Sequence, residues 1–346
     1  MISKKKIYTL LSLLLLSTGL FFLLDLALGS VNIPIDSVLN ILGGSKEKTS
    51  WTYIILSFRL PKAITAILVG GGLSIAGLQM QTLFRNPLAG PYVLGISSGA
   101  SLGVAILLMA GSILAGTSML QNPIFDIYGM VISAILGASL VLLLVVAVSM
   151  KISDTVSLLI IGIMFGNLTG AIVSILQYYS NPEQVQSFLI WTFGSLGGVT
   201  WSQLKWVMPL VLAGISIAFG LQKSLNALLL GENYAQGIGV SVNKIRLWMI
   251  LSTSLIAGTL TAYTGPIAFI GVAVPHIGRL LFRTSDHQIL MPAVGLFGAL
   301  LMLICDIISQ LPGTNQTLPI NSVCAMFGAP VVIWVVMKSR NVKANF

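Results

Sequence analysis

Apolar residues form long, uninterrupted stretches along most of this chain, and short polar segments separate them. The stretches lack the alternation of half-buried strands, so a transmembrane β-barrel is set aside. Most approach the roughly 20 apolar residues that a helix needs to cross a bilayer. The pattern predicts an all-α polytopic membrane protein, a single transmembrane domain over residues 1–346, with about ten transmembrane helices. The predicted spans are 6–28, 60–83, 92–110, 127–150, 155–179, 203–221, 246–264, 267–282, 288–310 and 317–338, with a short half-helix at 183–193.

Composition agrees with this pattern. The chain has 56% hydrophobic and 8% charged residues, and its mean hydropathy of +0.97 excludes a water-soluble globule. The first apolar run follows Lys4, Lys5 and Lys6, as in a secretory signal. Its apolar core is longer than that of a signal, and no A-x-A cleavage pattern follows, so we expect it to be the first helix. The loop between the first two spans shows no packing signal.

Basic residues are distributed unevenly among the predicted loops. With the N-terminus in the cytoplasm, only Lys46, Lys48, Arg59, Lys62 and Lys205 of the 18 basic residues lie outside. Because basic residues near helix ends resist translocation, we predict a multi-pass protein of the bacterial cytoplasmic (inner) membrane with both termini in the cytoplasm. The net charge of +9 then reflects topology and contact with membrane lipid, and nucleic acid is not expected as a partner.

Glycines recur in a way that favours close helix packing. Two series repeat at every fourth residue: Gly95, Gly99 and Gly103, and Gly162, Gly166 and Gly170. Small residues at this spacing let helix backbones approach one another in lipid, where the hydrophobic effect does not drive helices together. We expect packing ridges, which would also permit helices to slide during a transport cycle.

The longest polar interruption of the second half covers about 222–246. Two short helices joined at Gly231 would suit it, with Leu225, Leu228 and Leu229 on one apolar face and Ala235, Ile238 and Val240 on the next. In the predicted topology this segment is cytoplasmic. It is interpreted either as a docking platform for a soluble partner or as an ordinary solvated loop.

Catalytic patterns are absent from the sequence. It has two histidines and nine acidic residues, without an H-E-x-x-H, a G-x-S-x-G or a phosphate-binding glycine-rich loop. We therefore expect no enzymatic activity, no metal site and no cofactor bound by this chain. Cys305 and Cys324 fall inside predicted spans, where a thiol is most often a small apolar filler. Acidic residues such as Asp25 and Asp306 fall at predicted helix ends, which disfavours an ion path through the membrane.

Several sequence blocks together resemble one transporter family. Glu232, Ala235 and Gly239 form E-x-x-A-x-x-x-G, which is similar to the coupling motif of ABC-transporter membrane subunits. The other blocks are RLPK at 59–62, VGGGLSIAGLQMQTLFRNPLAGPYVLGISSGA at 69–100, FIGVAVPHIGRLLFRTSDHQILMP at 269–292 and LPINSVCAMFGAPVVIWVV at 318–336. In order and spacing they resemble the FecCD-type permeases for iron-siderophore, haem and cobalamin import, which are membrane subunits of type II ABC importers.

The resemblance implies a binding-protein-dependent importer that translocates a metal chelate into the cytoplasm. Ferric siderophore or haem is the leading substrate, and cobalamin is an alternative. The expected partners are a second permease copy or a paralogue, two ATP-binding subunits that hydrolyse ATP, and an extracytoplasmic substrate-binding protein. An ion-coupled secondary transporter acting alone is the alternative function.

The resemblance also assigns roles to residues. Contact with the ATP-binding subunit is expected at Leu229, Gly231, Glu232, Ala235, Gly239 and Val240. A cytoplasmic gate is expected at Ser153, Asp154, Thr155 and Val156, where Ser153 or Asp154 could equally serve as a helix N-cap. Docking of the binding protein is expected at Arg59 and Lys62, with Gln310 at a position where family members often carry arginine. For Arg59 and Lys62, contact with lipid phosphates at the membrane interface is the alternative.

Overall fold

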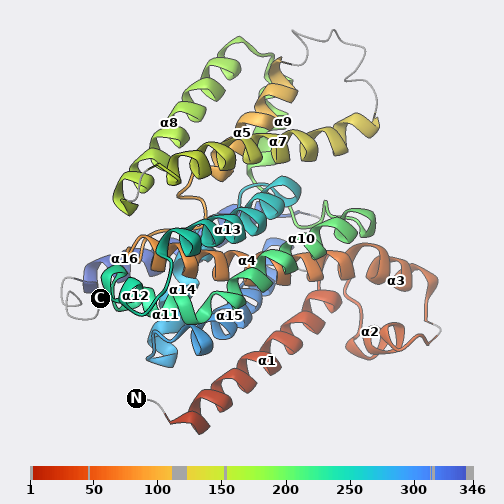
Figure 1. The fold of residues 1–346 in the computed structure, drawn as a ribbon. Helices are drawn as coiled ribbons and strands as arrows, with labels where there is room; N and C mark the ends of the chain where they lie inside the picture. Colours follow the sequence, from red (N-terminus) through yellow and green to blue (C-terminus); the bar gives the residue numbers. More distant parts are fainter. Residues whose placement is uncertain are drawn as a thin grey trace.

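The computed structural model describes residues 3–45, 47–110, 123–151, 154–311, 313 and 316–339, and the regular elements in these residues are all helices. Figure 1 shows them in two groups, with α5, α7, α8 and α9 apart from the bundle formed by the others. The smaller group contains α5 (Ile96–Ala105), a π-helical turn (Ile106–Ala110), α7 (Pro123–Ser149), α8 (Thr155–Tyr179) and α9 (Pro182–Thr192). The all-α fold expected from the sequence is confirmed.

The larger bundle is built around α4 (Leu60–Leu83), whose residues beyond Ile67 are almost all buried. Its other members are α1 (Lys4–Ala27), α2 (Ile35–Leu42), α3 (Thr49–Ile54), α10 (Trp201–Gly220), α11 (Gln222–Leu229), α12 (Glu232–Gly237), α13 (Val242–Thr264), α14 (Ile270–Phe282), α15 (His287–Ser309) and α16 (Ile320–Ser339). α15, α14, α13 and α10 all pack on α4. The central helix α4 therefore forms the middle of the hydrophobic core of the larger bundle.

The predicted spans correspond to observed helices. In the described residues, seven helices are long and apolar enough to cross a membrane, and three shorter apolar helices (Ile96–Met109, Ile270–Phe282 and Ile320–Trp334) coincide with the remaining predicted spans. The start of α1 lies at the same end of the bundle as α11 and α12 (Figure 1), as the predicted topology requires. The short half-helix expected at 183–193 is α9.

The second span begins earlier than the sequence predicted. One continuous helical segment runs from Thr49 to Leu83, whereas the expected start was residue 60. Pro61 lies inside it, and a π-helical turn at Ile55–Arg59 precedes the proline. Proline lacks an N–H and its ring crowds the preceding turn, and a widened turn accommodates both without ending the helix.

The loop before this segment is also more ordered than expected. It contains α2, in which Ser37, Val38 and Ile41 are buried. The prediction of a loop without packing was wrong, because Val38 and Ile41 lie three residues apart in this short helix and share the face that packs inward.

Close backbone contacts confirm the first glycine series as a packing ridge, but they confirm only the beginning of the second series. A Cβ atom at Gly99 would lie 2.5 Å from the Gly137 carbonyl oxygen of α7, and one at Gly103 would collide with the Ser133 carbonyl oxygen. In the second series, Gly162 contacts Val93 in the same way, whereas Gly170 has open space around it. The first ridge is therefore a packing surface along its length, and the second only at its start.

Candidate functional site

The polar interruption at 222–246 folds as the two short helices predicted from the sequence. α11 follows α10 directly, and Gly231, with φ of +119°, separates it from α12. Gly239, with φ of +85°, ends α12 before α13 begins. Both glycines occupy a backbone region that side chains with a Cβ rarely adopt, so they fix the turns of this segment. We call α11, α12 and the residues joining them, 222–241, the coupling segment.

Apolar side chains of the coupling segment divide between the core and the surface. Leu225, Leu228 and Ala235 are buried. The exposed apolar residues are Leu229 (38%), Leu230 (67%), Tyr234 (51%) and Ile238 (56%), and Val240 is half-buried. Ala235, expected to contact a partner, instead packs inward. Sequence analysis did not identify Leu230, which lies between the two helices, or Tyr234, although Tyr234 precedes Ile238 by four residues and so lies on the same face. We call Leu229, Leu230, Tyr234 and Ile238 the exposed patch.

A hydrogen-bond network fixes α11 to the bundle. Asn226 donates from Nδ2 to Asp286 Oδ1 at 2.6 Å, and its Oδ1 lies 2.8 Å from both the backbone nitrogen and Nδ1 of His287. His287 Nε2 lies 2.9 Å from the hydroxyl of Thr82 in α4. His287 is almost completely buried. Sequence reasoning missed these residues, since the positions that meet lie far apart in the chain.

A second attachment joins α12 to α13. Glu232 Oε1 accepts from Arg246 Nη2 at 3.4 Å, and the Arg246 side chain is 3% exposed. Arg246 Nε and Nη1 have no hydrogen-bond partner in the described part of the chain. Glu232 therefore supports the local fold, in addition to the partner contact expected from the resemblance.

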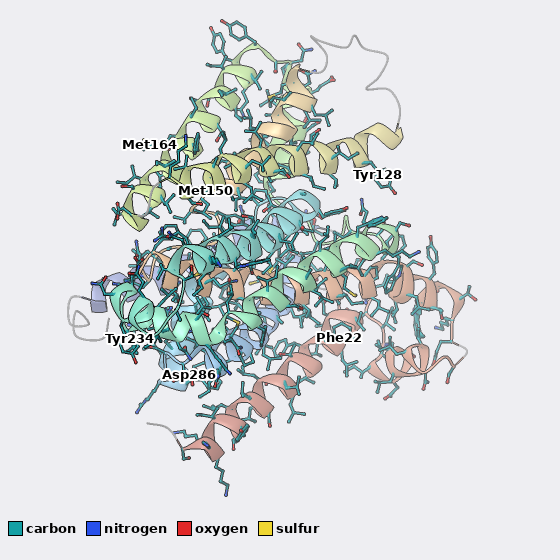
Figure 2. The ribbon with its side chains drawn as sticks, in the orientation of Figure 1. Phe22, Tyr128, Met150, Met164, Tyr234 and Asp286 are labelled. Atoms are coloured by element: carbon teal, nitrogen blue, oxygen red, sulfur yellow. The ribbon has the colours of Figure 1, made fainter. Side chains whose placement is uncertain are left out.

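The expected gate lies next to the coupling segment. Asp154, Arg85 and Glu232 line one cavity of about 420 Å³ together with Leu230 and Tyr234. Figure 2 shows Met150, at the end of α7, on the same side of the molecule as Tyr234. The two predicted functional elements are thus brought together around a shared polar space.

At the gate, Asp154 is the N-cap of α8. Its carboxylate accepts from the Ser157 hydroxyl at 2.6 Å and from the backbone nitrogens of Ser157 and Val156 at 2.8 and 3.3 Å. These hydrogen bonds lower the pKa of Asp154 below its usual value, and the bond from the Ser157 hydroxyl has the largest effect. Val156 is 58% exposed. Ser153 lies outside the described residues, as does the side chain of Thr155.

The three residues predicted to dock a binding protein lie together at the opposite end of the bundle, where Lys62 and Gln310 are half-buried and Arg59 faces inward. Arg59 is 6% exposed. Its guanidinium donates to the carbonyl oxygens of Leu26 and Ala27 at 2.8 and 2.9 Å and also to that of Val31. The expectation that its charge lies on the surface was wrong, because the Leu26 and Ala27 carbonyls at the end of α1 have no partners within the helix and the guanidinium turns inward to them.

Two acidic residues complete this outer network. Lys62 forms an ion pair with Asp306 at 2.8 Å. Gln310 donates from Nε2 to Asp25 Oδ1 at 3.0 Å and to Asp306 Oδ2 at 3.2 Å. The network joins α1, α4 and α15. Ionisable residues inside a span usually pair with one another, and this signal could have identified Asp25 and Asp306 as partners of the basic pair.

Metal-ligating residues do not cluster in the described ranges, which contain no group of three or more His, Cys, Asp or Glu suited to an ion. Cys305 and Cys324 are buried free thiols. The described residues form a bundle with seven helices long and apolar enough to cross a membrane, a platform with exposed apolar side chains at one end and a charged network at the other. These features define a multi-pass membrane protein.

Comparison with known proteins gives the family. The model of the FecCD transport family matches residues 14–338, and the chain belongs to this family. It is 32% identical over 334 residues to the hemin transport system permease protein of Yersinia pestis, covering 96% of this chain and 98% of that protein. It is 34% identical over 290 residues to the vitamin B12 import system permease protein of Vibrio cholerae serotype O1, with 83% and 84% covered.

Solved structures agree with this assignment. One neighbour, described as a metal-chelate type ABC transporter in an inward-facing conformation, has a TM-score of 0.82 and 30% identity, with 95% of this chain and 99% of that chain covered. PsaBC from Streptococcus pneumoniae in complex with Fab has a TM-score of 0.55 at 16% identity, covering 86% and 94%, and shows the fold alone. The resemblance to the type II importer permeases is confirmed.

Proposed function

We propose that this chain is the membrane subunit of a binding-protein-dependent ABC importer that moves a metal chelate into the cytoplasm, driven by ATP that a separate subunit hydrolyses. The observation that carries the proposal is the coupling segment. Its exposed patch lies on two short helices. These helices are attached to the bundle by the Asn226 hydrogen bonds and by the ion pair between Glu232 and Arg246. Exposed apolar side chains on a rigid support favour a protein partner. Movement of that partner would reach the neighbouring gate at 153–156.

We propose ferric siderophore or haem as the substrate, with cobalamin as the alternative. Support comes from relatives whose printed names are hemin and vitamin B12 permeases, and from the metal-chelate type neighbour. The described residues hold no metal-ligating cluster. A path that releases an intact chelate does not need such ligands, because recognition can rest with the binding protein.

The proposed assembly contains a second permease copy or paralogue, two ATP-binding subunits below the coupling segments and a binding protein outside, in the bacterial inner membrane with both termini cytoplasmic. At the outer end, Lys62 and Gln310 remain candidates for contact with the binding protein. Arg59 would act indirectly, since it holds the backbone carbonyls that shape the adjoining loop.

Reconstitution in proteoliposomes separates this proposal from the ion-coupled carrier. The chain is inserted alone, or with its ATP-binding subunit and binding protein, and uptake of radiolabelled ferric siderophore, haem and cobalamin is followed. We expect uptake only in the complete system with ATP, unchanged when proton and sodium gradients are collapsed. Accumulation by the chain alone under an ion gradient would instead establish the carrier.

A further inference from the structure

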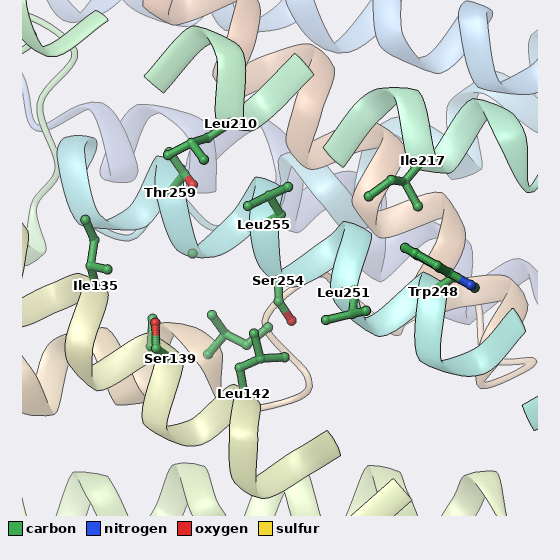
Figure 3. Close-up of a pocket in the computed structure, with 13 residues that line it drawn as sticks. Ile135, Ser139, Leu142, Leu210, Ile217, Trp248, Leu251, Ser254, Leu255 and Thr259 are labelled. Atoms are coloured by element: carbon green, nitrogen blue, oxygen red, sulfur yellow. The ribbon is translucent and has the colours of Figure 1, made fainter. Parts of the chain in front are cut away.

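A lateral groove of about 430 Å³ lies between α7, α10 and α13 (Figure 3), and none of its lining residues belongs to the coupling segment, the gate or the outer network. All three helices are candidate membrane spans. Trp248, Leu210 and Ile135 line the groove and are 49%, 40% and 37% exposed, so the groove opens at the protein surface. If these three helices cross a bilayer, the groove opens toward the hydrocarbon core, where methylene groups rather than water would fill it.

Small residues on facing helices create the groove. Ser139 of α7 and Ser254 and Gly258 of α13 form part of its wall, whereas leucine and isoleucine side chains form most of the remainder. A Cβ atom at Gly258 would lie 3.8 Å from Ala138 Cβ, so the helices approach closely at its floor. The Ser254 hydroxyl is buried and has no hydrogen-bond partner among the residues that the structure describes. A serine in a membrane helix can turn its hydroxyl to the carbonyl four residues earlier, so this group does not require a polar ligand.

The length of the groove matches half of a bilayer. On α13 its lining extends from Trp248 to Thr259, which is about 16 Å at 1.5 Å per residue. The hydrocarbon core of a bilayer is about 30 Å thick, so one leaflet contributes roughly 15 Å. An acyl chain of a single leaflet would occupy the groove over its length.

The end nearest the coupling segment carries the residues that favour a lipid headgroup. Trp248 lies two turns from the start of α13, and exposed Lys244 precedes it by four residues, on the same face of the helix. Lys244 makes no ion pair with the described residues. Tryptophan is favoured at membrane interfaces, and lysine beside a span attracts anionic headgroups.

We propose that this groove binds one acyl chain of an anionic phospholipid from the leaflet on the side of the coupling segment, with Lys244 contacting the headgroup phosphate. The site is independent of the transported substrate. Bound there, the lipid would fill the space between α7 of the smaller helix group and α10 and α13 of the larger bundle. It would therefore stabilise one arrangement of the two groups.

Photo-crosslinking tests the site in the unmodified protein. Nanodiscs contain phosphatidylglycerol or phosphatidylcholine with the same diazirine-bearing acyl chain at equal mole fraction, and labelled peptides are mapped by mass spectrometry. We expect labelling of groove residues such as Leu251 and Leu255, about fivefold greater from phosphatidylglycerol, since one lysine near the surface has an effect of that size on anionic lipid. Labelling spread evenly over lipid-facing helices would overturn the proposal.

Two substitutions test the chain and headgroup contributions separately. Ser139→Phe should reduce groove labelling at least tenfold, because the ring occupies the space of the acyl chain. Ser216→Phe, at an exposed position of α10 that does not line the groove, is the matched control and should label as wild type does. Lys244→Gln should remove the preference for phosphatidylglycerol. Unchanged labelling in Ser139→Phe, or an unchanged preference in Lys244→Gln, contradicts the acyl or the headgroup contact respectively.

Discussion

Arg59 and Arg246 are both buried, but their charges are satisfied in different ways. Arg59 donates to three backbone carbonyls, whereas Arg246 has one carboxylate partner and two nitrogens without a partner in the described chain. Removing the single partner of a buried donor leaves the full desolvation cost in place. The structure therefore predicts that the coupling segment is sensitive to Glu232 for reasons of stability as well as partner contact.

Glu232→Ala should lower the free energy of unfolding by about 1–3 kcal/mol, because it leaves the Arg246 guanidinium without its carboxylate. Thermal unfolding of the purified protein measures the change. Arg246→Met in the same background removes the buried charge and should recover part of the loss. Equal stability of Glu232→Ala and wild type would show that water satisfies Arg246 and that the ion pair contributes little.

Gly239 is a second residue whose role follows from backbone geometry. With φ of +85° and open space around its Cβ position, a substitution there meets strain but no steric contact. Gly239→Val should cost about 1–2 kcal/mol and impair coupled transport, whereas Gly239→Asn should be tolerated better, since asparagine enters this region more readily. Parallel uptake and unfolding measurements test the difference, and equal behaviour of the two variants would refute a conformational role.

The Asp154 N-cap should give α8 a defined pH dependence. The folded-state pKa is lowered, so the carboxylate contributes stability that is complete above its unfolded pKa of about 4 and lost as pH falls through the folded pKa. Asp154→Asn should therefore weaken the fall in stability of α8 below about pH 4. Hydrogen exchange of the first turn of α8 at pH 3–7 measures how the stability of this turn depends on pH. A wild-type profile in the variant would contradict the assignment.

The sequence predicted where candidate residues lie in the fold better than it predicted which way their side chains point. The motif RLPK and Gln310 were correctly grouped at one end of the bundle, yet Arg59 faces inward. Its carbonyl partners lie about 30 residues away in the sequence, and Asp25 and Gln310 are 285 residues apart. Neither periodicity nor charge pattern reveals such pairings.

At the scale of elements, the apolar stretches predicted the spans because length alone identifies a membrane helix. The coupling helices were also predictable, since Gly231 interrupts two short amphipathic runs. The earlier start of the second span was not, because Pro61 and Lys62 gave the appearance of a helix beginning there.

The Asn226 network makes α11 and α15 act as one unit. Asn226→Ala removes the donor to Asp286 and the acceptor for His287 together. Backbone amides of 222–230 should then exchange with deuterium at least several-fold faster, while those of the α10 interior should be unchanged. Hydrogen exchange mass spectrometry tests this. Gln236→Ala, at an exposed position of α12, is the control, and unaltered exchange in Asn226→Ala would contradict the anchoring role.

At the scale of the whole molecule, the coupling segment and the smaller helix group both leave apolar side chains exposed. The exposed patch has no covering element in the described chain, and α8 carries exposed apolar residues from Val156 to Tyr179. α8 also lies among the helices set apart from the bundle (Figure 1). We propose that the second permease copy and the ATP-binding subunit cover these surfaces.

The most direct test of the central claim is ATP-driven substrate uptake by the assembled complex carrying Tyr234→Asp and Ile238→Asp. Both side chains are exposed and outside the fold-supporting contacts, so the free energy of unfolding should remain near the wild-type value. Gln236→Asp, on the same short helix but outside the exposed patch, is the matched control. The account predicts that uptake falls at least tenfold and that the ATP-binding subunit no longer co-purifies, while the control transports normally. Normal uptake by the double variant would contradict the assignment of the coupling segment as the site where ATP hydrolysis drives this permease.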